Sequence, residues 1–282
     1  MNRQSTLALV MALLPITSIQ ADEPAAQQAT TTSNVEQLLS DAIERGKMLY
    51  EFDQAAWHST DAFVALAPDM AKLSLAGRII VPVEGGLQAI YYGKSEKGRF
   101  AVFHGTWNGK AIVDSVYSKG ESGAPLSPDA IAYAEIAELV TSGTLDTKDL
   151  WFCNKAQPNH ALLPGNAPGE FLLYFMTAQD KNESYPLGGH HRFDIKDRKV
   201  VARRAFTKSC IAMNKGDGRR EAVGFVISHL LDPVPTEIHV FTAIASGKAV
   251  FVSTKSGMAW NVEPSGGTAR IQGIDLGEKE GN

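Results

Sequence analysis

Histidines are concentrated between Gly188 and Phe251, a stretch that holds four of the seven histidines of the chain. Neutral imidazole serves proteins both as a metal ligand and as an acid–base group near neutral pH. The candidate catalytic residues are therefore three of these histidines and the acids that lie near them in the sequence. They are His191, His229 and His239, supported by Glu237 or Asp232.

The spacing of these residues argues against a metal centre. The stretch contains no His-x-x-x-His pair for one helix face and no Cys-x-x-Cys motif. Adjacent His190 and His191 cannot point the same way on a strand, which weakens them as joint ligands. We therefore predict no metal ion and no cofactor. A histidine-dependent hydrolase, in a metal-free or a metal-dependent form, is the catalytic hypothesis.

Strand periodicity assigns a face to the first two histidines. Alternate side chains of a strand point to opposite sides of the sheet. Over residues 189–195 this turns His191 inward with Phe193, and His190 outward with Arg192. A buried polar group that finds no partner costs about 1–3 kcal/mol. The simplest interpretation of an inward histidine is thus a core residue bonded to a backbone carbonyl or to a neighbouring acid.

The other two histidines are placed on strands by the same pattern. A strand over residues 222–230 puts His229 on its apolar face, and residues 236–243 are interpreted as a further strand that carries His239. The link Asp232-Pro233-Val234-Pro235 is stiff, because proline fixes its own backbone angle φ. The two histidines are therefore expected on neighbouring strands at the closest.

A basic segment follows the histidine pair. Between Arg192 and Arg220 there are ten Lys or Arg and three Asp, a net charge of +7 in a chain whose total is −4. A patch of one sign attracts ligands of the opposite sign, which predicts an anionic partner: a lipid headgroup, an acidic polysaccharide or an acidic protein face. The alternative is a solvated hairpin whose charges pair with the acidic remainder of the chain. The candidate binding residues are Arg192, Lys196, Arg198, Lys199, Arg203, Arg204 and Lys208.

The N-terminus has the composition of a secretory signal peptide. Arg3 gives a positive start, residues 7–16 are apolar, and Ile19-Gln20-Ala21 resembles a cleavage site. The apolar stretch is too short to span a membrane. We predict a signal peptide over residues 1–21, a periplasmic or secreted protein, and no membrane span in the mature chain. The acidic total charge and the lack of a recognisable binding module argue against a nucleic-acid partner.

The chain contains two cysteines, Cys153 and Cys210. In an oxidising compartment a pair of cysteines usually forms a disulfide, and we predict one here. The alternative is a nucleophilic Cys153 assisted by His160, although the residues around Cys153 carry no recognisable nucleophile motif.

The pattern of elements predicts an α+β fold. A flexible leader (22–33) precedes N-terminal helices capped at Ser33 and continuing over 54–66, in which Trp57 and His58 are interpreted as packing and surface residues. Four strands over 78–116, separated by Gly85-Gly86, residues 95–98 and Asn108-Gly109, predict an antiparallel meander. One central helix begins at Ser127-Pro128 and ends at Gly143. The expected folded parts are 34–146 and 147–276, as two domains or one, followed by a tail over 277–282.

The second part is predicted to be β-rich and mostly antiparallel. Residues 157–169 are expected to form a loop, and 171–176 a central strand. Further strands are expected over 190–195, 200–207, 249–253 and 259–262.

Three function classes fit these features. The chain lacks Gly-x-Ser-x-Gly, the P-loop motif and His-Glu-x-x-His. This favours a non-catalytic envelope or extracellular binding protein that uses its basic segment for an anionic partner. The histidine-dependent hydrolase is the first alternative. The second is a structural or inhibitory partner protein that works through a sheet edge.

Overall fold

The computed structural model describes residues 23–181, 184–214, 216 and 222–274 of the 282-residue chain. The predicted signal peptide and the predicted tail lie outside these residues. The chain divides into two compact units, 1–37 and 38–282. The described part of the first unit is the start of helix α1, and the predicted boundary near residue 146 falls inside the second unit. Every contact discussed below lies within the second unit.

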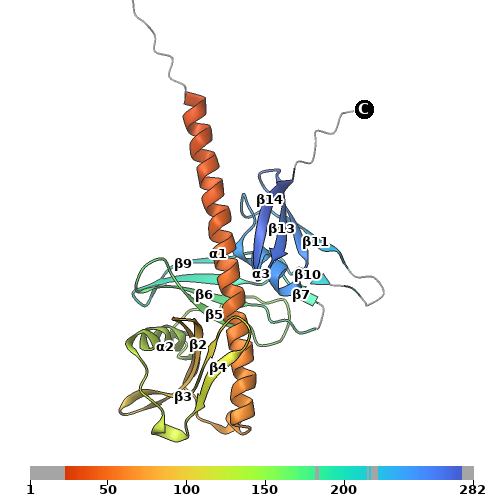
Figure 1. The fold of residues 1–282 in the computed structure, drawn as a ribbon. Helices are drawn as coiled ribbons and strands as arrows, with labels where there is room; N and C mark the ends of the chain where they lie inside the picture. The colour runs from red at the N-terminus through yellow and green to blue at the C-terminus, as the bar shows by residue number, and fades with distance from the viewer. Residues whose placement is uncertain (1–22, 182–183, 215, 217–221, 275–282) are drawn as a thin grey trace, which may run out of the picture. The chain divides into compact units, whose positions relative to one another are not determined.

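Helix α1 (Glu23–Leu66) is a single helix, in which the residues predicted as a leader are helical too (Figure 1). The two helices predicted after the leader are therefore one. Pro24 lies in the first turn, where the missing N–H of proline leaves no hydrogen bond unmade. The following alanines and glutamines have good helix propensity, and no Pro or Gly interrupts the residues between the two predicted helices. Among the described residues, no helix is both long enough and apolar enough to cross a membrane.

The first sheet is the predicted meander. Its four strands pair antiparallel in the order β1-β2-β3-β4, and the Gly85-Gly86 and Asn108-Gly109 turns have glycines at positive φ. Phe63 of α1 stacks against Phe103 and meets Tyr91 edge-on to form the core under this sheet. The strands are β1 (Gly77–Val83), β2 (Gly86–Ser95), β3 (Gly98–Trp107) and β4 (Ile112–Tyr117).

Helix α2 (Pro128–Thr141) begins and ends as predicted. The Ser127 side chain caps it by accepting a hydrogen bond from the Ala130 N–H, and Gly143 follows it at positive φ. Glu138 of α2 accepts two hydrogen bonds of 2.7 Å from the Arg99 guanidinium of β3. This forked ion pair ties the helix to the first sheet. Short 3-10 turns lie at Met70–Lys72 and Gly120–Ser122.

The second sheet has the order β5-β6-β8-β9, with β6 in a central position as predicted. The loop predicted over 157–169 was wrong in part, because residues 159–164 form edge strand β5. Prolines 158 and 164 lie before and at the end of this strand, where a missing backbone N–H is tolerated. The strands are β5 (Asn159–Pro164), β6 (Glu170–Met176), β8 (His191–Lys196) and β9 (Lys199–Ala205), and β7 (Ser184–Pro186) pairs separately with β10 (Ala212–Asn214).

The third sheet corrects the prediction around His239. Residues 237–246 form helix α3 rather than a strand. This helix connects β11 to β12, which pair parallel, and parallel neighbours need such a crossover. Thr236 at the N-cap and Gly247 at positive φ are helix start and stop signals. The sheet order is β11 (Gly224–His229), β12 (Ala249–Thr254), β13 (Ala259–Ser265) and β14 (Thr268–Ile274).

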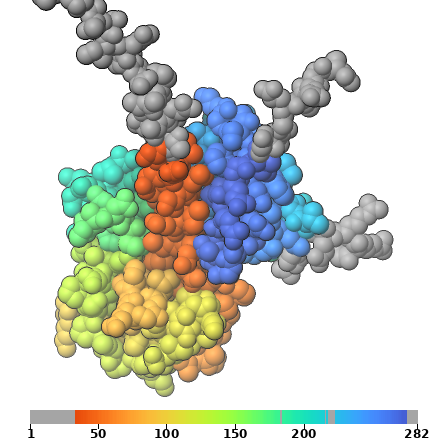
Figure 2. Space-filling view, turned by 45° about the horizontal axis from the view of Figure 1, so that its top comes forward, coloured from red at the N-terminus to blue at the C-terminus, as the bar shows by residue number. Residues whose placement is uncertain are grey.

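Helices α1 and α3 approach each other closely at Gly46. A Cβ at this position would lie 2.5 Å from Cβ of Val240 and 2.8 Å from the carbonyl oxygen of Glu237. In the space-filling view the orange-red surface of α1 has green surface, the colour of the β5–β6 region, on one side and the blue surface of the third sheet on the other (Figure 2). Helix α1 therefore contributes side chains to both neighbourhoods.

A disulfide joins Cys153 to Cys210, as predicted, with their Cα atoms 5.3 Å apart. The bond links the segment before β5 to the segment between β9 and β10. Because Cys153 is not a free thiol here, the alternative of a cysteine nucleophile has no support in this state of the protein.

Candidate functional site

The predicted catalytic histidines do not form one cluster. His191 faces inward on β8, as predicted, and its Nε2 lies 2.8 Å from the carbonyl oxygen of Trp151. Its ring meets the rings of Trp151 and Phe152 edge-on. This histidine is therefore a packed residue bonded to the backbone, and its burial lowers its pKa.

His229 and His239 do come together, with Asp232 beside them. Their ring centroids are 4.7 Å apart, and the Nε2 of His229 lies 2.7 Å from a carboxylate oxygen of Asp232. Arg204 donates to the same oxygen at 2.7 Å. Burial opposes ionisation of Asp232, but its bonds to His229 and Arg204 outweigh burial and lower the pKa.

This buried histidine pair has the contacts of a structural network. The Nδ1 of His239 accepts a hydrogen bond from the Thr236 N–H at 2.9 Å and completes a capping box at the start of α3. Burial, followed by the neighbouring His229, lowers the pKa of His239 to about 3. Neither histidine lines any of the cavities described below. No group of three or more His, Cys, Asp or Glu within the described ranges could hold a metal ion.

Glu237 belongs to a different network, centred on Arg192. Its carboxylate accepts a hydrogen bond of 2.6 Å from Arg192 and one of 3.1 Å from the Tyr174 hydroxyl. Arg192 also donates to Asp194 at 2.7 Å. Burial and the Glu237 carboxylate raise the pKa of Tyr174 well above its usual value. These contacts join the second sheet to the start of α3.

We expect Glu237→Ala to destabilise the protein by about 3 kcal/mol, because removing one partner leaves a largely buried guanidinium with less compensation. The value lies at the low end of the range for such pairs, since Asp194 still holds Arg192. Urea unfolding followed by circular dichroism measures the loss, and Glu263→Ala, at an exposed position, is the control. Equal unfolding midpoints for the two variants would contradict a stabilising role for this network.

Most of the predicted basic binding segment is paired within the protein. Besides Arg192 and Arg204, three of its residues lie within 4 Å of an acid, whereas Lys199 and Lys208 have no ion pair among the described residues. Paired surface charges attract external anions less strongly. The structure therefore favours the alternative of a hairpin whose charges pair with the acidic remainder. The three pairs are Lys196–Glu170, Arg198–Glu135 and Arg203–Asp149.

His190 was predicted to face outward, and this was wrong: the residue is only 1% exposed. Strand β8 begins at His191, so strand alternation does not reach His190. The preceding Gly189 has a φ of 71° and turns the chain. The Nε2 of His190 lies 2.9 Å from the carbonyl oxygen of Pro186. Burial lowers the pKa of His190 to about 4, so the ring is neutral near pH 7.

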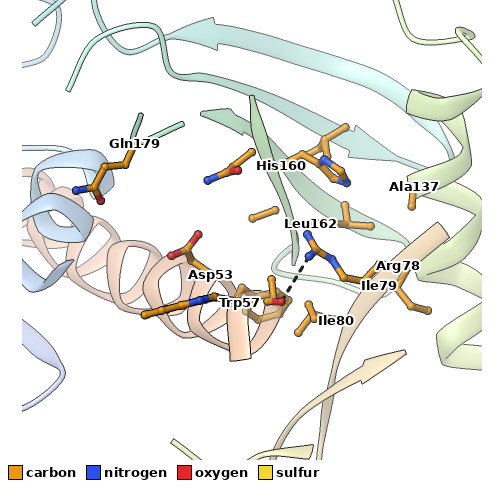
Figure 3. Close-up of a pocket in the computed structure, with 14 residues that line it drawn as sticks. Asp53, Trp57, Arg78, Ile79, Ile80, Ala137, His160, Leu162 and Gln179 are labelled. Atoms are coloured by element: carbon orange, nitrogen blue, oxygen red, sulfur yellow. Dashed lines mark hydrogen bonds between the residues drawn. The ribbon is translucent and has the colours of Figure 1, made fainter. Parts of the chain in front are cut away.

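A cleft of about 630 Å³, lined by both polar and apolar side chains, lies between α1, β1 and β5 (Figure 3). Asp53 and Trp57, one helical turn apart, project into it from α1. The close-up places His160 and Gln179 on the other side of the cavity from Trp57, with Arg78 of β1 between His160 and Trp57. The polar and aromatic lining residues are Asp53, Trp57, Arg78, Asn159, His160 and Gln179.

Arg78 is the cation of this cleft. Its Nη1 lies 3.5 Å from the Ala56 carbonyl oxygen and 3.5 Å from the Thr60 hydroxyl, so both hydrogen bonds are long. No carboxylate within the described residues lies within ion-pair distance of it. Burial raises the pKa of Asp53 while Arg78 opposes this shift, and burial together with Arg78 lowers the pKa of His160.

Trp57 gives the cleft an exposed aromatic wall. Its side chain is 58% exposed. The ring stacks on His58 at 4.7 Å, and His58 stacks on Trp107 at 4.8 Å. Trp107 donates its indole N–H to Glu51 at 2.8 Å, which fixes the far end of this stack. Trp57 was interpreted as a packing or surface residue rather than part of a site; it is exposed, and it also lines this cavity.

Comparisons of the chain with family models, curated proteins and solved structures found no match. What the cleft can bind or catalyse is therefore inferred from its own side chains. The 14 lining residues include no Ser, Thr, Cys, Lys or Tyr, so the usual hydroxyl, thiol and amine nucleophiles are missing from this list. A guanidinium, a carboxylate, two amides and an indole face are groups that bind and orient a ligand.

Proposed function

We propose that the protein is a non-catalytic binding protein that holds a small organic anion in the cleft between α1, β1 and β5. The observation that carries the proposal is Arg78, a guanidinium that lines the cavity without a carboxylate partner among the described residues. A planar guanidinium matches a carboxylate or phosphate with two parallel hydrogen bonds. Cavities of about 300–1,000 Å³ are typical of small-molecule sites.

The other cleft residues support an organic ligand rather than a bare ion. Asn159 and Gln179 offer amide donors and acceptors, and Trp57 offers a flat apolar face. Asp53 places a carboxylate in the same cavity, which disfavours ligands of high negative charge. An acid of one or two negative charges that also carries hydrogen-bonding groups suits this set best.

The proposal moves the anionic partner away from the basic segment over Arg192–Lys208, where most of the charges are paired internally. It keeps the predicted class of envelope or extracellular binding protein. The disulfide is compatible with an oxidising compartment. We therefore propose that the protein acts in the periplasm or outside the cell, although the residues that would carry the export signal lie outside the described part of the chain.

We expect Arg78→Gln to weaken the binding of small carboxylates by roughly 10–100-fold, the range for losing hydrogen bonds to a charged group. Isothermal titration calorimetry with glutarate and galacturonate measures this loss. Arg198→Gln is the matched control, since Arg198 is an exposed arginine that does not line the cleft. Wild-type binding should also weaken between about 50 and 500 mM salt, because ions screen the attraction.

Two results would contradict the proposed anion site at Arg78. If Arg78→Gln binds these acids as the wild type does, while a Lys199→Gln/Lys208→Gln variant loses them, the anion site lies on the basic segment and the proposal is wrong. If no carboxylate or phosphate ester binds the wild type at low salt, the cleft is not an anion site.

A further inference from the structure

A second cavity, of about 370 Å³, adjoins the cleft. Four residues line both: Asp53 and Trp57 from α1, with Asn159 and Gln179 opposite. The second cavity extends from these shared residues towards α3 and the bend before β8. Its lining includes Tyr185, His190 and Thr242. The two cavities therefore adjoin each other, with Arg78 and His160 lining the first and His190 and Thr242 lining the second.

His190 lines this second cavity and carries a buried hydrogen-bond acceptor that no described residue uses. Its side chain is buried, and its Nδ1 has no hydrogen-bond partner in the described structure. The Pro186 carbonyl can only accept a hydrogen bond, so the Nε2 atom 2.9 Å away must carry the proton. In the neutral ring the Nδ1 is then a bare acceptor. This atom requires a donor, an O–H or N–H, from a ligand or from solvent.

Thr242 lines the same cavity and carries a buried hydroxyl that no described residue uses. The residue is 1% exposed, and its Oγ1 also has no partner within the described ranges. A threonine inside a helix commonly donates to the carbonyl four residues earlier, and this one does not. Leaving a buried hydroxyl unsatisfied costs about 1–3 kcal/mol. Both residues line one cavity, so a ligand there that brought polar groups to these two atoms would relieve this cost.

We infer that the ligand is a hydroxylated acid of the saccharide type, with its carboxylate on Arg78 and its hydroxyls reaching His190 and Thr242. This inference rests on the proposed function. A sugar hydroxyl can donate to Nδ1 of His190, and a neighbouring hydroxyl can bond with Oγ1 of Thr242. The Trp57 ring, which both cavities share, offers a flat face for the C–H side of a sugar ring. An apolar tail would leave both atoms unsatisfied.

The variant that tests the second half of the site is Thr242→Val. Valine has nearly the same shape and removes a hydroxyl that has no protein partner, so the unfolding midpoint should stay equal or rise. Calorimetry should show digalacturonate binding about 3–10-fold more weakly to this variant, the range for one neutral hydrogen bond. Binding of glutarate, which has no hydroxyl, should not change. Thr242→Ser keeps the hydroxyl and should bind both acids as the wild type does.

The outcomes separate the inference from the proposed function. If Thr242→Val binds digalacturonate with wild-type affinity, the second cavity does not recognise hydroxyls, and the role of Arg78 is untouched. If Arg78→Gln binds glutarate as the wild type does, the anion site itself fails. The affinities of the wild-type protein for the two acids give a test that does not depend on the folding of a variant. Digalacturonate should bind at least about 10-fold more tightly than glutarate. Equal affinities would overturn the inference.

Discussion

Between pH 6.5 and 4.5 the folded protein should lose about 5 kcal/mol of stability, at about 1.4 kcal/mol per pH unit for each of two buried histidines. Burial lowers the pKa of His190 to about 4 and that of His239 to about 3. In the unfolded chain both titrate near the ordinary value of about 6.5. The unfolded state thus binds more protons over this range, so stability falls as the pH falls.

Other titratable groups with shifted pKa values increase or decrease this loss of stability. Asp232, with its lowered pKa, adds to the loss only below the ordinary Asp value of about 3.9. Asp53, with its raised pKa, works in the opposite direction because its carboxylate is easier to protonate in the folded state. For His239, burial and the neighbouring His229 outweigh the Asp232 carboxylate, which favours the protonated ring. Burial also lowers the pKa values of His160 and His191, so these two histidines add to the loss in the same direction.

The measurement is urea unfolding at pH 7.0, 6.0, 5.0 and 4.5, and His239→Gln is the control. Glutamine at this position can still accept the Thr236 N–H in the capping box but does not titrate. Its stability should therefore fall less steeply with pH than that of the wild type, by about 1.4 kcal/mol per pH unit. If the variant and the wild type lose the same stability on acidification, His239 is not protonating on unfolding, and its assignment as a buried neutral residue is wrong.

Loss of the disulfide is the second large effect, expected at about 4 kcal/mol. The bond closes a loop with a sequence separation of 57, and the chain-entropy account gives about this value for such a loop. The Cys153→Ser/Cys210→Ser variant should show the loss as a lower urea midpoint. Reducing the wild type with dithiothreitol should give the same shift, and an unchanged midpoint after complete reduction would contradict it.

The disulfide also supports the second cavity. A Cβ on Gly188 would lie 2.9 Å from Cα of Cys210, and one on Gly189 would lie 3.1 Å from Sγ of Cys153. The bend that turns His190 inward therefore rests directly against the bond. We expect the serine variant to lose affinity for digalacturonate while it retains affinity for glutarate. Equal losses for both acids would show that the bond supports the fold as a whole rather than this bend.

Local sequence signals predicted the parts of the fold that local chemistry decides. Ser127-Pro128 and Gly143 bound α2 because capping and backbone geometry act over a few residues. The glycine turns of the first sheet follow from the same kind of signal. Helix α3 was missed because it is buried on most sides, so its apolar residues show no clear period of 3.6.

The site could not be read from the sequence in the same way. Asp53, Arg78 and His160 lie far apart in the chain and match no spacing rule, and the packing of α1 against β1 and β5 brings them together. The pair Asp53 and Trp57 at one-turn spacing was a usable signal, since it places both on one helix face. Strand alternation could not predict the inward turn of His190, because this turn depends on Gly189 and on the disulfide beside it.

The central claim is that the cleft at Arg78, and not the basic segment, receives the ligand. Nuclear magnetic resonance of ¹⁵N-labelled protein titrated with digalacturonate tests it most directly. The account predicts that the indole N–H of Trp57 and the Nε–H of Arg78 shift with saturation, together with backbone signals near His190 and Thr242. Shifts confined to the backbone around Lys199 and Lys208, with the Trp57 indole unmoved, would contradict it.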